Sequence, residues 1–185
     1  MKKKLLLLLF IIPALLLVVT GCGKKEEKKP VENNTKTIEL TDKKFGYKTT
    51  FTYDKSENYS DIDVDTDSGR TTEIEFENEE LDVEFEMYYT DMRSTTYKET
   101  QEIRSKQKYY KEYNFGKYKA YAYGEYSSSI HLNILIDTDQ DTDMAKIIFV
   151  EISRMDTNED IVIADVVSGK KIQALLNSIE VKKIS

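Results

Sequence analysis

The residues in this chain that could do chemistry are mostly carboxylates, and the densest group lies between residues 73 and 86. Six of them alternate with apolar residues on either side of a short polar turn, Asn78-Glu79-Glu80. These six are Glu73, Glu75, Glu77, Asp82, Glu84 and Glu86. Alternation with a period of two is typical of a half-buried strand, and two such runs around a polar turn predict an antiparallel hairpin. We therefore expect the six carboxylates to share one face of a sheet, where like charges oppose one another.

Something must relieve this repulsion: solvent and salt, lysines of a neighbouring strand such as Lys117 and Lys119, or a basic partner. Exposed ion pairs contribute little to stability, so a solvated face with local lysine neighbours is the plainer interpretation. The functional alternative is a binding surface for a basic protein. Its candidate residues are Glu73, Glu75, Glu84 and Glu86.

Two series of alternate aspartates have the spacing of cation-binding loops. One runs from Asp137 to Asp143 between two predicted strands, and the other from Asp61 to Asp67. Calcium takes six to eight oxygen ligands, but in the first series Thr142 stands where an EF-hand requires glycine. Aspartates are ordinary in turns, so we assign no metal site and keep calcium in either loop as the alternative.

Catalytic groups are sparse in this sequence. His131 is the single histidine, and Ser127, Ser128 and Ser129 lie close to it without a nucleophile elbow or a glycine-rich oxyanion turn. Phosphate-binding loops and dinucleotide fingerprints are absent, and a net charge of −7 argues against nucleic acid as a partner. We therefore predict no enzyme and no cofactor, with a reaction at His131 and an aspartate as a third hypothesis.

The start of the chain has the order of a secretory signal. Met1 is followed by three lysines, an apolar run from Leu5 to Val19, and small residues before Cys22. A membrane-spanning helix needs roughly 20 apolar residues, and this run is shorter. Cys22 is the single cysteine of the chain, so it has no intramolecular disulfide partner.

Val19-Thr20-Gly21-Cys22 resembles the bacterial lipobox, in which the cysteine receives a diacylglyceryl group and becomes the new N-terminus after cleavage. The resemblance implies lipidation of Cys22 and a place on the outer face of a bacterial cell membrane, held there by lipid. We expect residues 1–21 to be the signal peptide, residues 22–35 a flexible linker of mixed charge, and residues 36–185 a single domain.

Beyond the linker, strand and helix patterns predict an α+β fold with an antiparallel sheet. Helices are expected from Thr95 or Thr96 to Lys111, and again near the end, beginning either at Asp160 or after Gly169. A long loop with some extended pairing is expected between residues 54 and 69. Strands are expected around residues 47–53, 118–126, 130–136 and 145–152. Within the last of these, an unbroken apolar run predicts a central strand buried on both faces.

This order of elements resembles the PsbP-like fold, an α/β/α sandwich around an antiparallel sheet. The segment from Phe115 to Tyr121 resembles that family's glycine turn into a strand, and Asn177-Ser178-Ile179 resembles its closing helix. PsbP proteins include extrinsic, sometimes lipid-anchored, subunits of photosystem II, so the resemblance implies docking to another protein. The acidic hairpin and the abundance of tyrosine depart from the family pattern.

Thirteen tyrosines occur, and they cluster between Tyr88 and Tyr126. Tyrosine suits recognition surfaces because it combines a rigid apolar ring with a polar tip. In the strand from residue 118 onward, alanines at 120 and 122 alternate with Tyr121 and Tyr123; we expect the alanines under a helix and the two tyrosines exposed to a protein or glycan. The sequence thus predicts a lipid-anchored binding or assembly module of the cell envelope. The alternative is a solute or glycan binder, which would carry a tyrosine-lined concavity.

Overall fold

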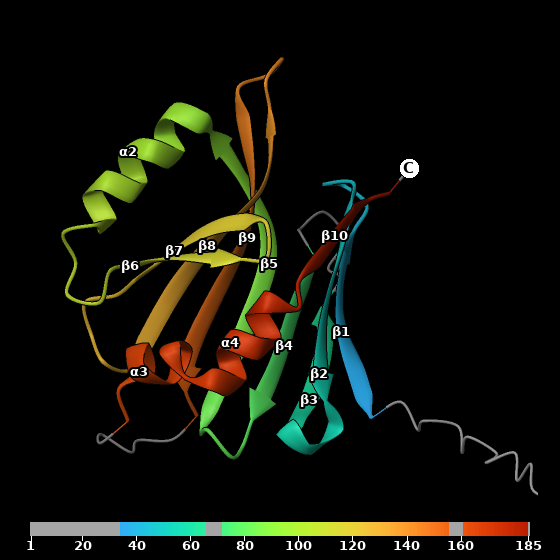
Figure 1. Cartoon of the computed structure of the whole chain (residues 1–185). Helices are drawn as coiled ribbons and strands as arrows, with labels where there is room; N and C mark the ends of the chain where they lie inside the picture. The colour runs from blue at the N-terminus through green and yellow to red at the C-terminus, as the bar shows by residue number, and fades with distance from the viewer. Residues whose placement is uncertain (1–33, 66–71, 156–160, 185) are drawn as a thin grey trace, which may run out of the picture. The chain divides into compact units, whose positions relative to one another are not determined.

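Two antiparallel sheets form the framework of the residues that the structure describes, 34–65, 72–155 and 161–184 (Figure 1). The structure is a computed structural model, and these residues belong to one unit, Asn34–Ser185. The predicted signal peptide, Cys22 and nearly all of the predicted linker lie outside the described residues. The smaller sheet has β2 (Tyr47–Asp54) in the middle, between β1 (Thr35–Asp42) and β10 (Glu180–Lys183).

The larger sheet has seven strands in the described part of the chain, and each neighbouring pair is antiparallel. Their order is β3 (Tyr59–Asp65), β4 (Glu73–Asn78), β5 (Val83–Arg93), β9 (Met144–Arg154), β8 (Ser129–Asp139), β7 (Tyr118–Tyr123) and β6 (Lys111–Phe115). β9 is the middle strand, and Ile147, Ile148 and Val150 are all buried. The prediction of a central strand covered on both faces is confirmed.

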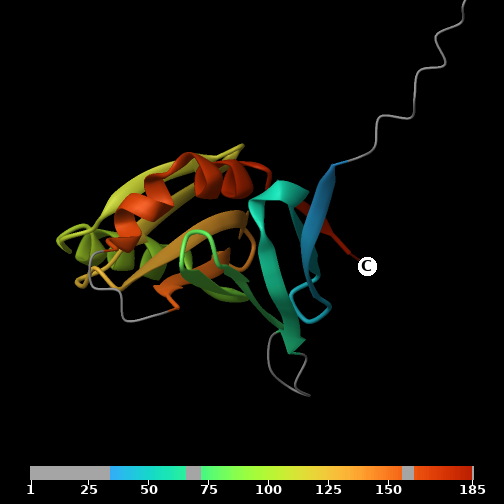
Figure 2. The same ribbon diagram turned by 90° about the horizontal axis from the view of Figure 1, so that it is seen from below.

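The main core lies against one face of the larger sheet. The predicted hairpin is confirmed as β4 and β5, whose alternate residues Ile74, Phe76, Phe85 and Met87 are fully buried. The Phe76 and Phe85 rings stack with their centroids 4.5 Å apart. Side chains of the smaller sheet and of the two C-terminal helices complete this core. Figure 2 shows these helices lying along the larger sheet.

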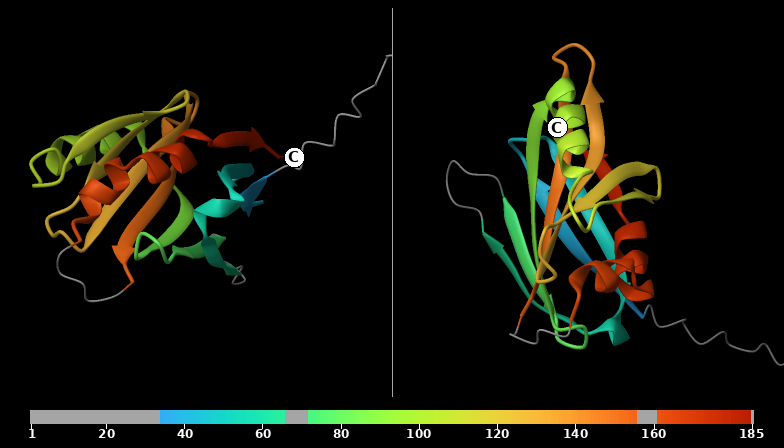
Figure 3. Two further views of the ribbon diagram at one scale, coloured as in Figure 1. Left: turned by 60° about the horizontal axis from the view of Figure 1, so that its bottom comes forward. Right: turned by 90° about the vertical axis from the view of Figure 1, so that its left-hand side faces the viewer.

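Helices cover both faces of the larger sheet. On the main-core side, α3 (Ile163–Ser168) and α4 (Lys170–Asn177) meet at Gly169, which answers the open question of where the last helix begins. The buried residues of α4 are Ile172, Leu175 and Leu176, the spacing of one helical face. On the opposite side α2 (Ser94–Arg104), apart from α3 and α4 in Figure 3, buries Tyr97 against a second, smaller cluster of β7 and β9 residues.

Two segments differ from the prediction. The helix expected to reach Lys111 ends at Arg104; its apolar stripe is thin, and alternation from Tyr109 onward favours β6. The closing helix ends at Asn177, where the Ser178 hydroxyl donates to the Leu175 carbonyl (2.6 Å), and β10 follows. In the described part of the segment 54–69, the expected extended pairing is present as β3, after a 3-10 helix, Lys55–Glu57.

The expected antiparallel sheet with packed helices is therefore present, but strands dominate. They account for 55% of the described residues and helices for 20%. The strands also form two separate sheets. β10 joins β1 and β2 in the smaller sheet and does not pair with the larger one. No helix of the described residues is long and apolar enough to cross a membrane.

Tyr89 connects the two sheets through its hydroxyl. The side chain is buried, and its hydroxyl oxygen lies 2.6 Å from Thr49 Oγ1 in β2 and donates to the Leu40 carbonyl of β1 at 3.2 Å. Burial raises the pKa of Tyr89. The hydroxyl thus stays neutral and serves as a polar link inside an otherwise apolar interface.

Replacement of Tyr89 by phenylalanine is expected to lower the free energy of unfolding by about 1 to 2 kcal/mol, because the buried Thr49 hydroxyl loses its partner. Urea unfolding of the two proteins measures the difference. Tyr126→Phe is the matched control, since Tyr126 is 76% exposed. Equal unfolding midpoints for Tyr89→Phe and the parent would contradict the proposed link.

Candidate functional site

Carboxylates of the larger sheet align across four neighbouring strands. In the hairpin, Glu75 lies opposite Glu86. Beyond it, Asp63 of β3 lies opposite Glu75, and Glu151 of β9 lies opposite Glu86. Directly paired residues of antiparallel strands project from the same face. We call Asp63, Glu75, Glu86 and Glu151 the acidic row.

The remaining carboxylates of the predicted face extend the row on either side. Glu77 lies opposite Glu84, and Glu73 lies opposite Tyr88. Asp82 belongs to the turn before β5, with a left-handed φ of 55°. The shared face is thus confirmed for the strand positions, and β3 and β9 enlarge it beyond the hairpin that the sequence indicated.

Carboxylates repel one another at the centre of the acidic row. Burial, followed by the charges of Glu73, Glu151, Glu75 and Glu84, raises the pKa of Glu86. Among the ion pairs of the described residues, none involves Glu75, Glu84 or Glu86. Glu75 and Glu84 are exposed, so cations from outside the domain can reach them.

The lysines expected to relieve the hairpin do not lie beside it, so that part of the prediction is wrong. Lys119 is in β7, which β8 and β9 separate from β5. Lys117 precedes β7, and its ammonium lies 5.2 Å from the centre of the Tyr118 ring. Sequence reasoning could not place these lysines because it did not give the order of the strands.

Aromatic side chains line up beside the acidic row. From β5 to β7 the rings of Tyr88, Phe149, His131 and Tyr123 follow one another with centroid distances of 4.9, 5.5 and 5.2 Å. We call these four residues the aromatic ladder. Aromatic faces attract cations, as carboxylates do. Row and ladder together form a surface suited to a positively charged ligand.

The ladder ends in a cavity of about 300 Å³ beside the last turn of α2. His131, Tyr123 and Phe149 contribute to its wall, and the Arg104 guanidinium lies 4.8 Å from the centre of the Tyr123 ring. His131 Nδ1 lies 3.5 Å from Glu151 Oε2. Arg104 shows how a guanidinium can stack on this ladder.

The exposure predicted for Tyr121 and Tyr123 is wrong. Tyr121 is fully buried and Tyr123 is 8% exposed. Both lie in the smaller cluster under α2, where the Tyr97 and Tyr121 ring centroids are 5.4 Å apart. The alanines that alternate with them lie in the main core with α3 and α4, as expected. β7 is therefore covered on both faces, whereas the sequence analysis predicted a helix over the alanine face alone.

The aspartate series at residues 137–143 begins in β8, which ends at Asp139, and only residues 140–143 form the turn. Asp137 Oδ2 accepts hydrogen bonds from the Tyr47 hydroxyl (2.5 Å) and the Lys183 ammonium (2.8 Å), which lower the pKa of Asp137. Asp139 accepts from the backbone N–H groups of Asp141 and Thr142. In the described residues no three His, Cys, Asp or Glu side chains are grouped to hold a metal. Of the other series, Asp61, Asp63 and Asp65 lie in β3, and Asp67 is outside the described residues.

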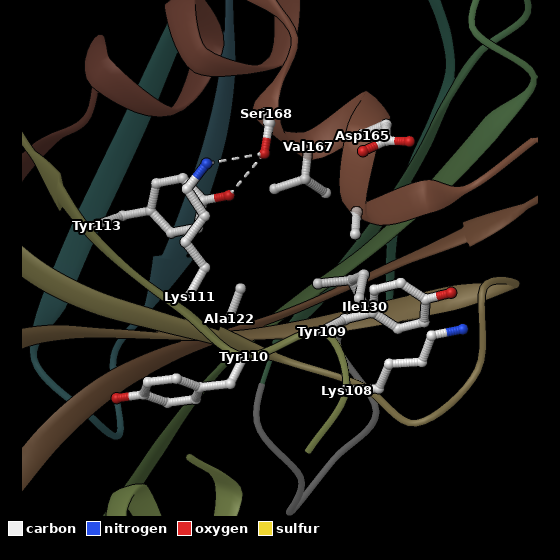
Figure 4. Close-up of a pocket in the computed structure, with 11 residues that line it drawn as sticks. Lys108, Tyr109, Tyr110, Lys111, Tyr113, Ala122, Ile130, Asp165, Val167 and Ser168 are labelled. Carbon is white, nitrogen blue, oxygen red and sulfur yellow. Dashed lines mark hydrogen bonds between the residues drawn. The ribbon is translucent and has the colours of Figure 1, made fainter. Parts of the chain in front are cut away.

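A second concavity lies on the opposite side of the larger sheet, between β6 and α3 (Figure 4). Tyr109, Lys111 and Tyr113 contribute to its wall, and Ala122 and Ile130 to its floor. It measures about 260 Å³. We call it the tyrosine pocket. Sequence reasoning missed it because Tyr109 and Lys111 were assigned to a helix.

Comparisons with protein-family models, with curated proteins and with solved structures found no match for this chain. The resemblances to the lipobox and to the PsbP-like fold therefore stay predictions.

Replacement of Glu86 by glutamine is expected to stabilise the protein at pH 7 by roughly 0.5 kcal/mol, the scale of directly opposed like charges in a sheet. Because the folded state raises the pKa of Glu86 above its usual 4.5, it binds the proton more tightly than the unfolded chain does. The free-energy cost of keeping Glu86 ionised in the folded state is absent below pH 4.5, where the carboxyl is protonated. This cost develops as pH rises through the folded-state pKa of Glu86.

Thermal or urea unfolding at pH 4 and pH 7 tests this expectation. The stabilisation by Glu86→Gln should be present at pH 7 and nearly absent at pH 4. Glu180→Gln removes the same charge from the other sheet and serves as the control. A Glu86→Gln protein that is less stable than the parent at pH 7 would show that the carboxylate has a favourable partner.

Proposed function

We propose that this protein is a lipid-anchored, non-catalytic binding or assembly module of the cell envelope, and that its acidic row docks a basic segment of a partner protein. The observation that carries the proposal is the alignment of four carboxylates across β3, β4, β5 and β9. The two central members, Glu75 and Glu86, have no cationic partner among the described residues.

A basic segment removes the repulsion within the acidic row as it binds. Cationic side chains placed between opposed carboxylates form charge-assisted hydrogen bonds, which are stronger than neutral ones. The negative field of the row also attracts a positively charged partner before contact and raises its association rate. Complementary charge thus supplies both attraction and selectivity for such a partner.

The aromatic ladder favours arginine over lysine in this segment. A guanidinium is planar, pairs with a carboxylate through two parallel hydrogen bonds and stacks on aromatic rings. Glu86 and Glu151 lie beside Tyr88 and Phe149 on β5 and β9, so one guanidinium can use both kinds of contact. A lysine ammonium would gain the charge interaction with less stacking.

The lipid anchor and the fold assignment belong to the same proposal. Three leader lysines, an apolar run and Val19-Thr20-Gly21-Cys22 support attachment through a fatty-acylated Cys22. Helices on both faces of the larger sheet support a PsbP-like arrangement, and the implied role of that family, docking to other proteins, agrees with the acidic surface. The separate three-stranded sheet is a departure from a single-sheet sandwich.

Charge reversal of two residues of the acidic row, Glu75 and Glu86, and of the neighbouring Glu84 tests partner binding; this triple change is the acidic-row variant. In Glu75→Lys/Glu84→Lys/Glu86→Lys, affinity of the full-length protein in detergent for a hexa-arginine peptide is expected to fall at least about tenfold, because several charge-assisted contacts are lost. Fluorescence anisotropy measures it. Glu99→Lys/Glu102→Lys/Glu180→Lys makes the same charge change at exposed positions of α2 and β10 and should bind like the parent.

Chemical cross-linking in intact cells applies the same pair of variants to the physiological partner. A basic envelope protein captured by the parent and by the control variant, but lost with the acidic-row variant, supports the proposal. Equal loss with both variants would mean that overall charge, and not the acidic row, attracts the partner, and the docking site would have to be abandoned.

Lipidation is tested separately by growing cells with an alkyne-tagged fatty acid. The parent is expected to carry the tag and to sediment with membranes, and Cys22→Ser is expected to lose the tag because the acceptor thiol is gone. Ser128→Ala is a control for an unrelated single change. Retention of the tag in Cys22→Ser would rule out this residue as the acyl site.

A further inference from the structure

We propose that the tyrosine pocket binds an anionic sugar, a single ring that carries a carboxylate or phosphate. This site lies on the main-core side of the larger sheet and does not depend on what the acidic row binds. The inference rests on three features of the pocket: tyrosine walls, an apolar floor and two lysines that form no ion pair with another described residue.

The walls follow from the alternation of the chain at β6. Lys111 and Tyr113 are alternate residues of β6 and project from one side, toward α3. Tyr109, in the turn before β6, packs against the same main core as Tyr113. The backbone N–H of Tyr109 donates to the Gly124 carbonyl at 3.1 Å and holds this stretch in place. In Figure 4 Tyr110, the alternate residue, points away from Ser168.

Hydroxyl and ammonium groups converge at the upper side of the pocket. The Lys111 ammonium donates to Ser168 Oγ at 3.1 Å, and the Tyr113 hydroxyl oxygen is also 3.1 Å from Ser168 Oγ (Figure 4). An ammonium has three donors, so Lys111 keeps donors for a ligand after binding Ser168. Asp165 lies on the α3 side and supplies an acceptor for ligand hydroxyls.

Two lysines, against one carboxylate, that of Asp165, line the pocket. Lys108 and Lys111 form none of the ion pairs found between described residues, although the chain is acidic with a net charge of −7. Their ammonium groups lie 4.7 Å from the centre of the Tyr109 ring and 5.1 Å from that of Tyr113. Two cations beside one opening favour an anionic ligand over a neutral one.

The floor and the size of the pocket select a sugar ring over a bare anion. Ala122 and Ile130 line the floor and Val167 lies on the α3 side, so the inner end of the pocket is apolar and gives an inorganic ion no polar partner. A sugar ring has an apolar C–H face, which packs on tyrosine rings and aliphatic groups, and hydroxyls at its edge. The volume of about 260 Å³ is below the usual range of roughly 300 to 1,000 Å³ for drug-sized ligands, so one ring is the expected occupant.

The alternative function predicted from the sequence was a glycan or solute binder with a tyrosine-lined concavity. The tyrosine pocket has that feature, but its tyrosines are Tyr109 and Tyr113 and not the buried Tyr121 and Tyr123. The protein can therefore combine a docking face for a basic partner with a separate site for an acidic sugar.

Titration calorimetry of the full-length protein in detergent tests the proposal with four probes: glucuronic acid, glucose 6-phosphate, glucose and acetate. At least one of the two anionic sugars is expected to bind roughly tenfold more tightly than glucose, since the neutral sugar lacks the charge-assisted contact. Acetate is expected to bind more weakly than glucuronic acid because it leaves the apolar floor empty. Preference for glucuronic acid or for glucose 6-phosphate identifies the acidic group as carboxylate or phosphate.

Two variants locate the binding. Lys111→Gln should lower the affinity for the anionic sugar about tenfold. Lys117→Gln is the control and should leave the affinity unchanged, although the Lys117 ammonium also lies over a tyrosine ring, 5.2 Å from its centre. Both lysines are exposed, so the fold tolerates the changes. Glucuronic acid and glucose 6-phosphate that bind no better than glucose, or an equal effect of the two variants, would overturn the proposal.

Discussion

Burial of alternate residues on β4 and β5 is the constraint on which the acidic surface depends. Packing a large apolar side chain such as Phe76, Phe85 or Met87 into the core contributes about 1.5 to 3 kcal/mol, whereas opposed like charges cost roughly 0.2 to 1 kcal/mol a pair. The apolar face therefore decides the register. A shift by one residue would place the carboxylates in the core, so the chain keeps Glu75 opposite Glu86 despite their repulsion.

The middle strand, β9, is covered along only part of its length on the face that carries the acidic row. β9 is buried on both faces near α2, but toward its end Glu151 reaches the surface beside Glu86. α2 packs over β7 and β9 and leaves this corner uncovered. The position of one short helix thus separates a sheltered tyrosine cluster from an open carboxylate surface. The carboxylates of the acidic row occupy the part of this face that α2 does not cover.

The order of apolar and polar residues along the chain was enough to predict the hairpin, which shows alternation, and the central strand, which shows an unbroken apolar run. It was not enough where contacts between distant segments determine which residues are neighbours or are covered. Asp63 and Glu151 join Glu75 and Glu86 only through the order of strands, which the sequence of β3 or β9 does not contain. Tyr121 and Tyr123 match an exposed pattern, but α2 covers them. Between Tyr109 and Lys111, helix and strand patterns compete. The chain makes a turn at Tyr109 and pairs with β7 from Lys111 onward, and this arrangement creates the tyrosine pocket.

β10 pairs with β2, so the third strand of the smaller sheet comes from the other end of the described chain. The backbone N–H of Ile184 also donates to the Gly46 carbonyl at 2.9 Å. During synthesis the β1–β2 hairpin emerges before β10, so the edge of β2 that β10 occupies stays unpaired for that time and can pair with another chain. Completion of the smaller sheet therefore depends on a strand made long after the other two, which makes this sheet sensitive to truncation at the far end of the described residues.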